Sequence, residues 1–154
     1  MPNTPVAIEQ GVSAIIGNNF SSLSQVNWTE KLFNNLGKTV ILEKESQIDA
    51  VTAISGSGPA YIFNFAETVI EIGKELGLSE QISKKIVLQT IVGAGLLANN
   101  SDKTPSKLRE NVTSPNGTTQ AALNILMDEK NGWHGIIKNA VFAAHKRSKI
   151  LAKN

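Results

Sequence analysis

The feature that most limits how this chain can fold is a helical segment that is apolar or small on every face. Residues 86–98 read Ile-Val-Leu-Gln-Thr-Ile-Val-Gly-Ala-Gly-Leu-Leu-Ala. A helix of this composition has no charged face to turn toward water, so it requires burial all round. A chain of 154 residues forms one core of ordinary size, and surrounding such a helix within it is difficult without a second chain. We therefore predict an intimate oligomer.

The composition excludes several classes of protein. Hydrophobic residues make up 41% of the chain and charged residues 18%, which is typical of a globular protein. The net charge of +2 is too small to indicate a nucleic-acid or membrane partner. The absence of cysteine excludes disulfides and thiolate metal sites, and no apolar run approaches the roughly 18 residues of a membrane span. With no signal segment visible, we expect a cytoplasmic location.

Residues 1–44 predict a β-α-β unit. A short apolar strand is expected at 11–16, followed by a helix that is capped by one of two adjacent serines and ends at Gly37. A second strand is expected at 38–42. Two parallel strands cannot cover their own faces, so we interpret this unit as the end of a larger α/β sheet.

From residue 45 onward the sequence predicts helices and no strand. The expected helices begin at or near Ile48, Pro59, Ser79, Thr104, Thr118 and Ile136, and Gly, Pro, Ser and Asn separate them. The first is expected to break at residues 55–58, Ser-Gly-Ser-Gly. We therefore place a domain boundary near residue 45, with an all-helical domain at 45–154.

The sequence shows no acid–base or metal site. His134 and His145 lie eleven residues apart and not on one face of a helix, so each is interpreted as a surface or capping histidine. No histidine pair or carboxylate cluster has the spacing of metal ligands. The glycines at residues 56–58 and 93–95 lack the pattern of a dinucleotide-binding turn. No basic recognition helix indicates nucleic-acid binding.

Residues 111–119 combine hydroxyl side chains, an Asn-Gly pair and backbone N–H groups at the expected start of a helix. Free amides and the helix dipole stabilise an anion there, and a small carboxylate suits such a site. The same pattern also describes an ordinary cap, in which Ser114 or Asn116 satisfies the helix and nothing binds. Spacing alone favours the cap, because caps are commoner than ligand sites.

Several motifs, in this order, resemble the Δ1-pyrroline-5-carboxylate reductases. They are MPNTP at 1–5, AVTAISGSGPAY at 50–61, QT at 89–90 and VTSPNGTT at 112–119, with NAV at 139–141 and RS at 147–148. The resemblance implies the last step of proline synthesis, in which NADPH or NADH reduces the cyclic imine to L-proline. It also implies a mainly α fold: a helical dimerisation and substrate-binding bundle at 45–154, preceded by a residual β-α-β piece of a Rossmann-type sheet. The bundle is expected to form a homodimer or a higher oligomer.

The resemblance further implies roles for individual residues. Thr119 is implied as the catalytic residue, offering its hydroxyl to the ring nitrogen. Ser114, Gly117 and Thr118 are implied to hold the substrate carboxylate through hydroxyl and main-chain N–H groups, and Glu45 and Asn111 to line the same pocket. Asn3, Thr4 and Pro5 match the stretch that approaches the nicotinamide. No metal is implied.

Two departures from the family pattern affect these expectations. Asn116 stands where the family usually has glycine, and asparagine tolerates left-handed backbone geometry, so we expect the turn to persist. The Gly-rich turn of the nucleotide-binding half is absent, so the adenine and pyrophosphate contacts have no place here. We therefore expect a C-terminal portion of the enzyme that is inactive alone and binds no cofactor tightly. The alternatives are one chain of a split enzyme, completed by a separate nucleotide-binding chain, and a non-catalytic oligomerisation remnant.

Overall fold

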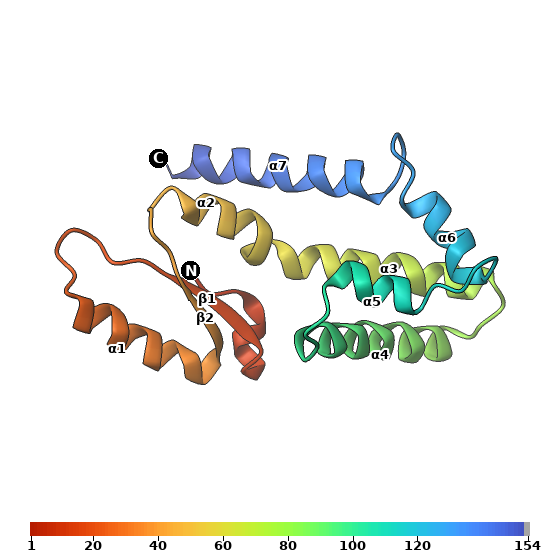
Figure 1. Ribbon diagram of the computed structural model, residues 1–154, viewed down its shortest axis with the longest axis horizontal. Helices are drawn as coiled ribbons and strands as arrows, with labels where there is room; N and C mark the ends of the chain where they lie inside the picture. The colour runs from red at the N-terminus through yellow and green to blue at the C-terminus, as the bar shows by residue number, and fades with distance from the viewer. Residues whose placement is uncertain (153–154) are drawn as a thin grey trace. The chain divides into compact units, whose positions relative to one another are not determined.

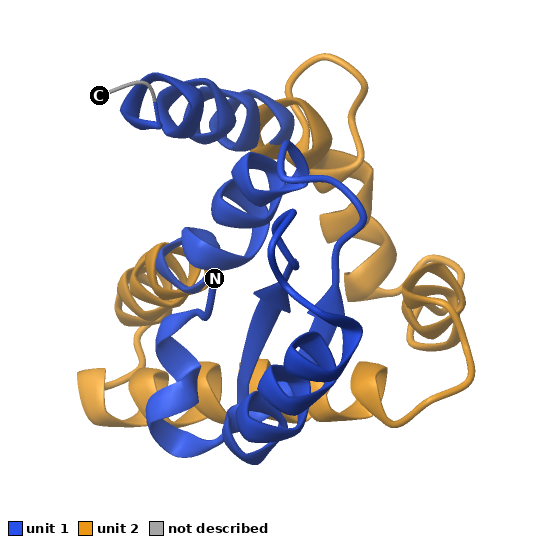
Figure 2. Cartoon of the chain, turned by 90° about the vertical axis from the view of Figure 1, so that its left-hand side faces the viewer, with its two compact units in different colours: residues 1–61, 138–154 blue, residues 62–137 orange. Residues whose placement is uncertain are grey.

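The computed structural model describes residues 1–152, which divide into two compact units (Figure 2). Unit 1 consists of Met1–Tyr61 and Lys138–Asn154, and unit 2 of Ile62–Ile137. The last two residues of the predicted helical domain, 153 and 154, lie outside the described residues. The predicted domain boundary near residue 45 stays a prediction.

Unit 1 contains the β-α-β unit that the sequence predicts. Strand β1 (Gly11–Ile15) pairs in parallel with β2 (Gly37–Ile41), and helix α1 (Leu23–Phe33) connects them (Figure 1). Short 3-10 helices, η1 (Thr4–Ile8) and η2 (Asn34–Leu36), precede the two strands. Gly37 has a φ of 134°, and a Cβ there would collide with the backbone of Gly11. The entry to β2 therefore requires glycine.

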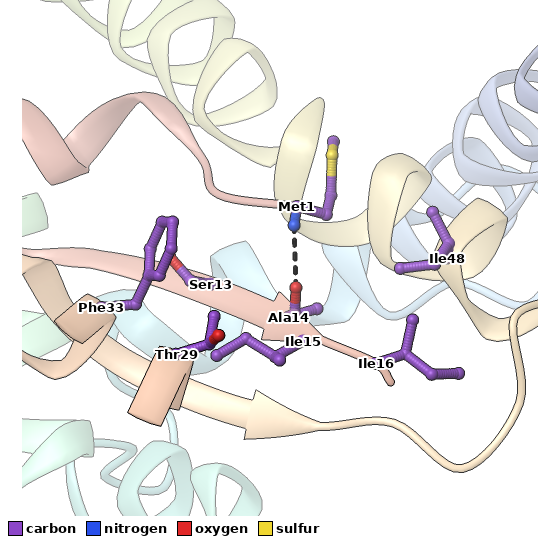
Figure 3. A pocket seen from close by; sticks show the side chains of 8 residues that line it. All are labelled: Met1, Ser13, Ala14, Ile15, Ile16, Thr29, Phe33 and Ile48. Atoms are coloured by element: carbon purple, nitrogen blue, oxygen red, sulfur yellow. Dashed lines mark hydrogen bonds between the residues drawn. The ribbon is translucent and has the colours of Figure 1, made fainter. Parts of the chain in front are cut away.

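Strand β1 is bonded on both of its edges. Strand β2 lies along one edge. On the other edge, the Met1 amino group donates to the Ala14 carbonyl oxygen at 2.8 Å (Figure 3). The Ala14 N–H donates to the Met1 carbonyl oxygen at 2.9 Å. Pro2 and Ser13 form an antiparallel bridge beside this pair. Ser13 and Ala14 are each 2% exposed, so β1 forms the centre of the unit 1 core.

The predicted break at residues 55–58 is wrong, because the chain stays helical through it. Helix α2 (Gln47–Val51) continues into the π-helical turn η3 (Thr52–Gly56) and then into α3 (Gly58–Glu75). The Ser57 N–H donates to the Thr52 carbonyl oxygen at 2.9 Å, and the Tyr61 hydroxyl donates to the Ala53 carbonyl oxygen at 3.0 Å. A wider turn thus accommodates the glycines without ending the helix.

Helices make up unit 2, and most of them begin where the sequence predicts. They are the greater part of α3, α4 (Glu80–Asn99), α5 (Pro105–Asn111), α6 (Thr118–Leu126) and the start of α7 (Trp133–Leu151). Ser79 caps α4 and Thr104 caps α5. Helix α7 begins before the predicted Ile136, because the Trp133 ring packs edge-on against Phe65, with centroids 5.6 Å apart.

Helix α4 is poorly covered within its own chain. Its buried residues are Ser83 and Val87. Six large apolar side chains are between 43% and 58% exposed: Ile82, Ile86, Leu88, Val92, Leu96 and Leu97. A Cβ at Gly93 or Gly95 would meet no atom within 4 Å. Glycine inside a helix costs roughly 0.5–1 kcal/mol, and no contact within the described residues explains this cost. No helix among the described residues is both long and apolar enough to cross a membrane.

The contact between α3 and α4 generates a stability prediction. A Cβ at Gly73 would lie 2.6 Å from Ser83 Oγ, whereas a Cβ at Gly135 would meet nothing within 4 Å. Gly73→Ala should therefore lower the free energy of unfolding by about 1–3 kcal/mol. Gly135→Ala, the matched control, should raise it by up to about 1 kcal/mol. Urea denaturation at one protein concentration measures both, and equal effects of the two variants would contradict the tight contact.

Candidate functional site

The loop between α5 and α6 has a defined backbone conformation. The Thr113 hydroxyl donates to the Arg109 carbonyl oxygen at 2.7 Å, and the Gly117 N–H donates to the Ser114 carbonyl oxygen at 3.0 Å. Asn116 has a φ of 60°, in the left-handed region. This confirms the expectation that asparagine maintains the turn in place of glycine.

The N-terminus of α6 is open, so the interpretation of this loop as an ordinary cap is wrong. Gly117 occupies the N-cap position, where it has no side chain to accept a hydrogen bond, and neither Ser114 nor Asn116 takes that role. A Cβ at Gly117 would collide with Ser114 Oγ, so the close turn excludes larger residues. Within the described part of the chain, the N–H groups of Thr118 and Thr119 have no acceptor. Such amides and the helix dipole favour an anion.

The predicted substrate-binding residues lie in both units. Asn111 ends α5 and is exposed, as are Ser114 and Thr118, whereas Gly117 and Thr119 are half-buried. These five residues belong to one continuous segment of unit 2, so the structure places them around one turn. Glu45 lies in unit 1, between β2 and α2, and is exposed.

The stretch predicted to approach the nicotinamide forms the start of η1 in unit 1. The Asn3 side-chain oxygen accepts the Val12 N–H at 2.9 Å, and the Pro5 carbonyl oxygen accepts the Gln10 N–H at 3.1 Å. Both residues therefore tie η1 to its neighbours. Thr4 is exposed, and its hydroxyl has no partner among the described residues.

The strand-to-helix turn before α1 lacks the pattern of a pyrophosphate site. Such a group binds at a Gly-rich turn where a strand enters a helix. Residues 17–22 read Gly-Asn-Asn-Phe-Ser-Ser, with a single glycine. At the start of α1, Ser22 Oγ accepts the Gln25 N–H at 3.3 Å and Gln25 Oε1 accepts the Ser22 N–H at 2.8 Å, which is a capping box. Gly17 lies against Val26, since a Cβ there would be 2.9 Å from Val26 Cγ2.

Two cavities in unit 1 contain none of the predicted site residues. One, of about 230 Å³, lies beside β1 and α1 (Figure 3) and is lined by Met1, Ser13, Ala14, Ile15, Ile16, Thr29, Phe33 and Ile48. The other, of about 220 Å³, is lined by Ala50, Ala53, Ile54, Val141, Phe142 and His145. His145 thus borders an apolar cavity, whereas His134 is exposed. No group of three or more metal-ligating side chains occurs among the described residues.

The helical part of the chain matches a known protein family. Residues 45–151 match the family described as pyrroline-5-carboxylate reductase dimerisation. The chain belongs to the pyrroline-5-carboxylate reductase family. This confirms the resemblance that the sequence motifs indicated.

Relatives in this family match almost the whole chain but only part of their own length. The pyrroline-5-carboxylate reductase of Pseudomonas aeruginosa is 42% identical over 153 residues, which are 99% of this chain and 55% of the relative. That of Pisum sativum is 39% identical over 152 residues, again 99% of this chain and 55% of the relative. The chain therefore spans about 55% of the length of these curated relatives.

Solved pyrroline-5-carboxylate reductases have the same fold over this region. The structure from Coxiella burnetii has a TM-score of 0.92 at 34% identity, covering 98% of this chain and 55% of that one. The Plasmodium falciparum pyrroline carboxylate reductase with NADP bound has a TM-score of 0.86 at 37% identity, covering 97% of this chain and 60% of that one. The predicted fold class is confirmed: mainly helical, with a small parallel β-α-β piece.

The left-handed geometry of Asn116 generates a second stability prediction. Asn116→Val should lower the free energy of unfolding by about 1–2 kcal/mol, because a β-branched residue is disfavoured at a φ of 60°. Asn116→Gly is the matched control and should be close to neutral, since glycine adopts this conformation freely. Chemical denaturation of the three proteins measures the effect. A valine variant as stable as the glycine variant would show that the turn is not left-handed in solution.

Proposed function

We propose that this chain supplies the substrate loop and the dimer interface of a pyrroline-5-carboxylate reductase. That enzyme would transfer a hydride from NADPH or NADH to the cyclic imine and form L-proline. The observation that most supports this proposal is the open N-terminus of α6, where Gly117 leaves the first amides of the helix without a cap. The substrate carries a carboxylate, which is the group that such a terminus stabilises.

In this proposal the carboxylate lies against the first turn of α6. The Gly117 N–H already donates to Ser114, so the N–H groups of Thr118 and Thr119 take the carboxylate. The Ser114 hydroxyl adds a further donor, and Gly117 contributes by having no side chain at the close approach. Asn111 lines the same pocket from the end of α5.

Positioning provides most of the catalysis in this proposal. When bound, NADPH or NADH would supply the hydride for C5 of the protonated imine, and the residues of this chain would bind and orient that imine. The Thr119 hydroxyl orients that nitrogen. The Glu45 carboxylate, which has no ion-pair partner among the described residues, favours the cationic imine. Asn3, Thr4 and Pro5 approach the nicotinamide.

We also propose that the chain alone binds NADPH or NADH weakly or not at all and does not turn over. The sequence supports this, because it contains no Gly-rich dinucleotide-binding turn between a strand and a helix. A separate nucleotide-binding chain would complete a split enzyme. The other alternative is a non-catalytic oligomerisation remnant, for which an exposed apolar surface on α4 is equally expected. A cytoplasmic location is part of the same proposal.

We propose a homodimer in which α4 packs against the second copy. Two observations support it: the family is described by its dimerisation, and the apolar side chains of α4 are exposed in the single chain. Close packing of α4 against the second copy also explains why residues 93 and 95 are glycine. A Cβ at either position would meet no described atom of the same chain within 4 Å. Higher assemblies of such dimers are compatible with the same surface.

Calorimetry with L-proline and with NADPH, titrated separately, tests the substrate site. The chain should bind L-proline weakly and show no heat of binding for NADPH. Thr119→Val should weaken L-proline binding about tenfold, because it removes a hydrogen bond to a charged group. Thr68→Val is the control, since the Thr68 hydroxyl bonds only its own helix, at Asn64. Absence of L-proline binding by the unsubstituted chain, or unchanged binding by the Thr119 variant, would refute the site.

Analytical ultracentrifugation tests the dimer. Gly93→Leu should shift the protein from dimer to monomer, because the added side chain fills the space of the second copy. The helix content should persist, since a Cβ at Gly93 meets no atom of its own chain within 4 Å. Ala143→Leu, on the exposed side of α7, is the control and should remain dimeric. A monomeric unsubstituted chain, or a dimeric Gly93 variant, would contradict this interface.

A further inference from the structure

The segment that carries Glu45 has no buried side chain to hold it in place. This connector, residues 43–46, lies between β2 and α2 (Figure 1). It reads Glu-Lys-Glu-Ser, and all of its residues are exposed. Ordering an exposed backbone costs conformational entropy, so hydrogen bonds must hold the connector if it has one conformation. The Glu45 carboxylate makes no hydrogen bond or ion pair with any described residue, so its position depends on the backbone alone.

The Gln47 side chain makes two hydrogen bonds to this connector. Gln47 Oε1 accepts the Glu43 N–H at 2.9 Å and the Lys44 N–H at 2.8 Å. The Gln47 N–H donates back to the Lys44 carbonyl oxygen at 2.9 Å, and the Ile48 N–H donates to the Glu45 carbonyl oxygen at 3.0 Å. Gln47 thus holds the two residues before Glu45, and the Ile48 N–H holds the Glu45 carbonyl oxygen.

The short helix that begins with Gln47 is bonded to a distant part of unit 1. It is the first residue of α2, and the Ser148 hydroxyl of α7 donates to Asp49 Oδ1 of the same short helix at 2.6 Å. Both partners are partly buried. This bond fixes α2 against α7, so the Gln47 amide is presented to the connector from an anchored helix.

We propose that Gln47 is a positioning residue for substrate binding, acting by fixing the connector and thereby Glu45. The inference rests on the proposed function, in which the Glu45 carboxylate faces the cationic imine. Gln47 touches neither substrate nor cofactor in this proposal. Its side-chain oxygen replaces water as the acceptor for two amides, and this restricts the Glu45 backbone to one conformation.

Two variants of Gln47 separate the hydrogen bonds from the bulk of the side chain. Gln47→Leu keeps the size but removes the acceptor, whereas Gln47→Glu keeps an acceptor oxygen. By NMR, Gln47→Leu should speed amide hydrogen exchange at Glu43 and Lys44 on the order of tenfold, and Gln47→Glu should restore the slow exchange. Gln10→Leu is the matched control, because the Gln10 side chain is exposed and unbonded among the described residues. Unchanged exchange in Gln47→Leu would overturn the inference.

Calorimetry with L-proline then asks whether Gln47 acts through Glu45. Gln47→Leu should weaken L-proline binding about fivefold in the unsubstituted chain and should have no further effect when Glu45→Gln is already present. A merely structural role would give the same loss in both backgrounds, and that result would overturn the inference. If Thr119→Val weakens L-proline binding but Gln47→Leu does not, this inference fails while the proposed function stands. If the unsubstituted chain does not bind L-proline, both fail.

Discussion

The surface of α4 is the constraint on which the rest of this structure depends. Burial of one large aliphatic side chain stabilises a protein by roughly 1.5–3 kcal/mol, and several such side chains on α4 remain about half-exposed in the single chain. A Cβ added at either of two glycines inside the same helix would meet no atom within 4 Å. Both observations are expected if a second copy covers the helix, as we propose, and membership of a family described by its dimerisation agrees with that proposal.

The N-termini of α1 and α6 are capped differently. At α1, Ser22 Oγ accepts the Gln25 N–H and Gln25 Oε1 accepts the Ser22 N–H. At α6, Gly117 is the N-cap and has no side chain to accept a hydrogen bond. Among the described residues, the N–H groups of Thr118 and Thr119 therefore have no partner, and such a terminus stabilises an anion.

Much of the local structure could be predicted from the sequence, and the failures share a cause. The strands, the Ser79 and Thr104 caps and the left-handed Asn116 were predictable, because each depends on residues within about four positions. The helix that continues through residues 55–58 was not, since its widened turn involves the Tyr61 hydroxyl eight residues from its acceptor. At the start of α6, spacing alone favoured a side-chain cap over free amides, because capping patterns in sequence do not reveal which residue occupies the N-cap.

For the candidate site, the sequence by itself determined the family and marked both the loop at residues 111–119 and the apolar surface of α4, because these follow from contiguous motifs and from the composition of one helix. The tertiary structure decided that the ring of Trp133, the first residue of α7, packs against Phe65. It also decided that the Gln47 side chain bonds the connector before Glu45 and that Ser148 of α7 bonds Asp49 of α2. Ser148 and its acceptor Asp49 are 99 residues apart. Contacts over such separations depend on how whole elements pack, and no local pattern of residues specifies them.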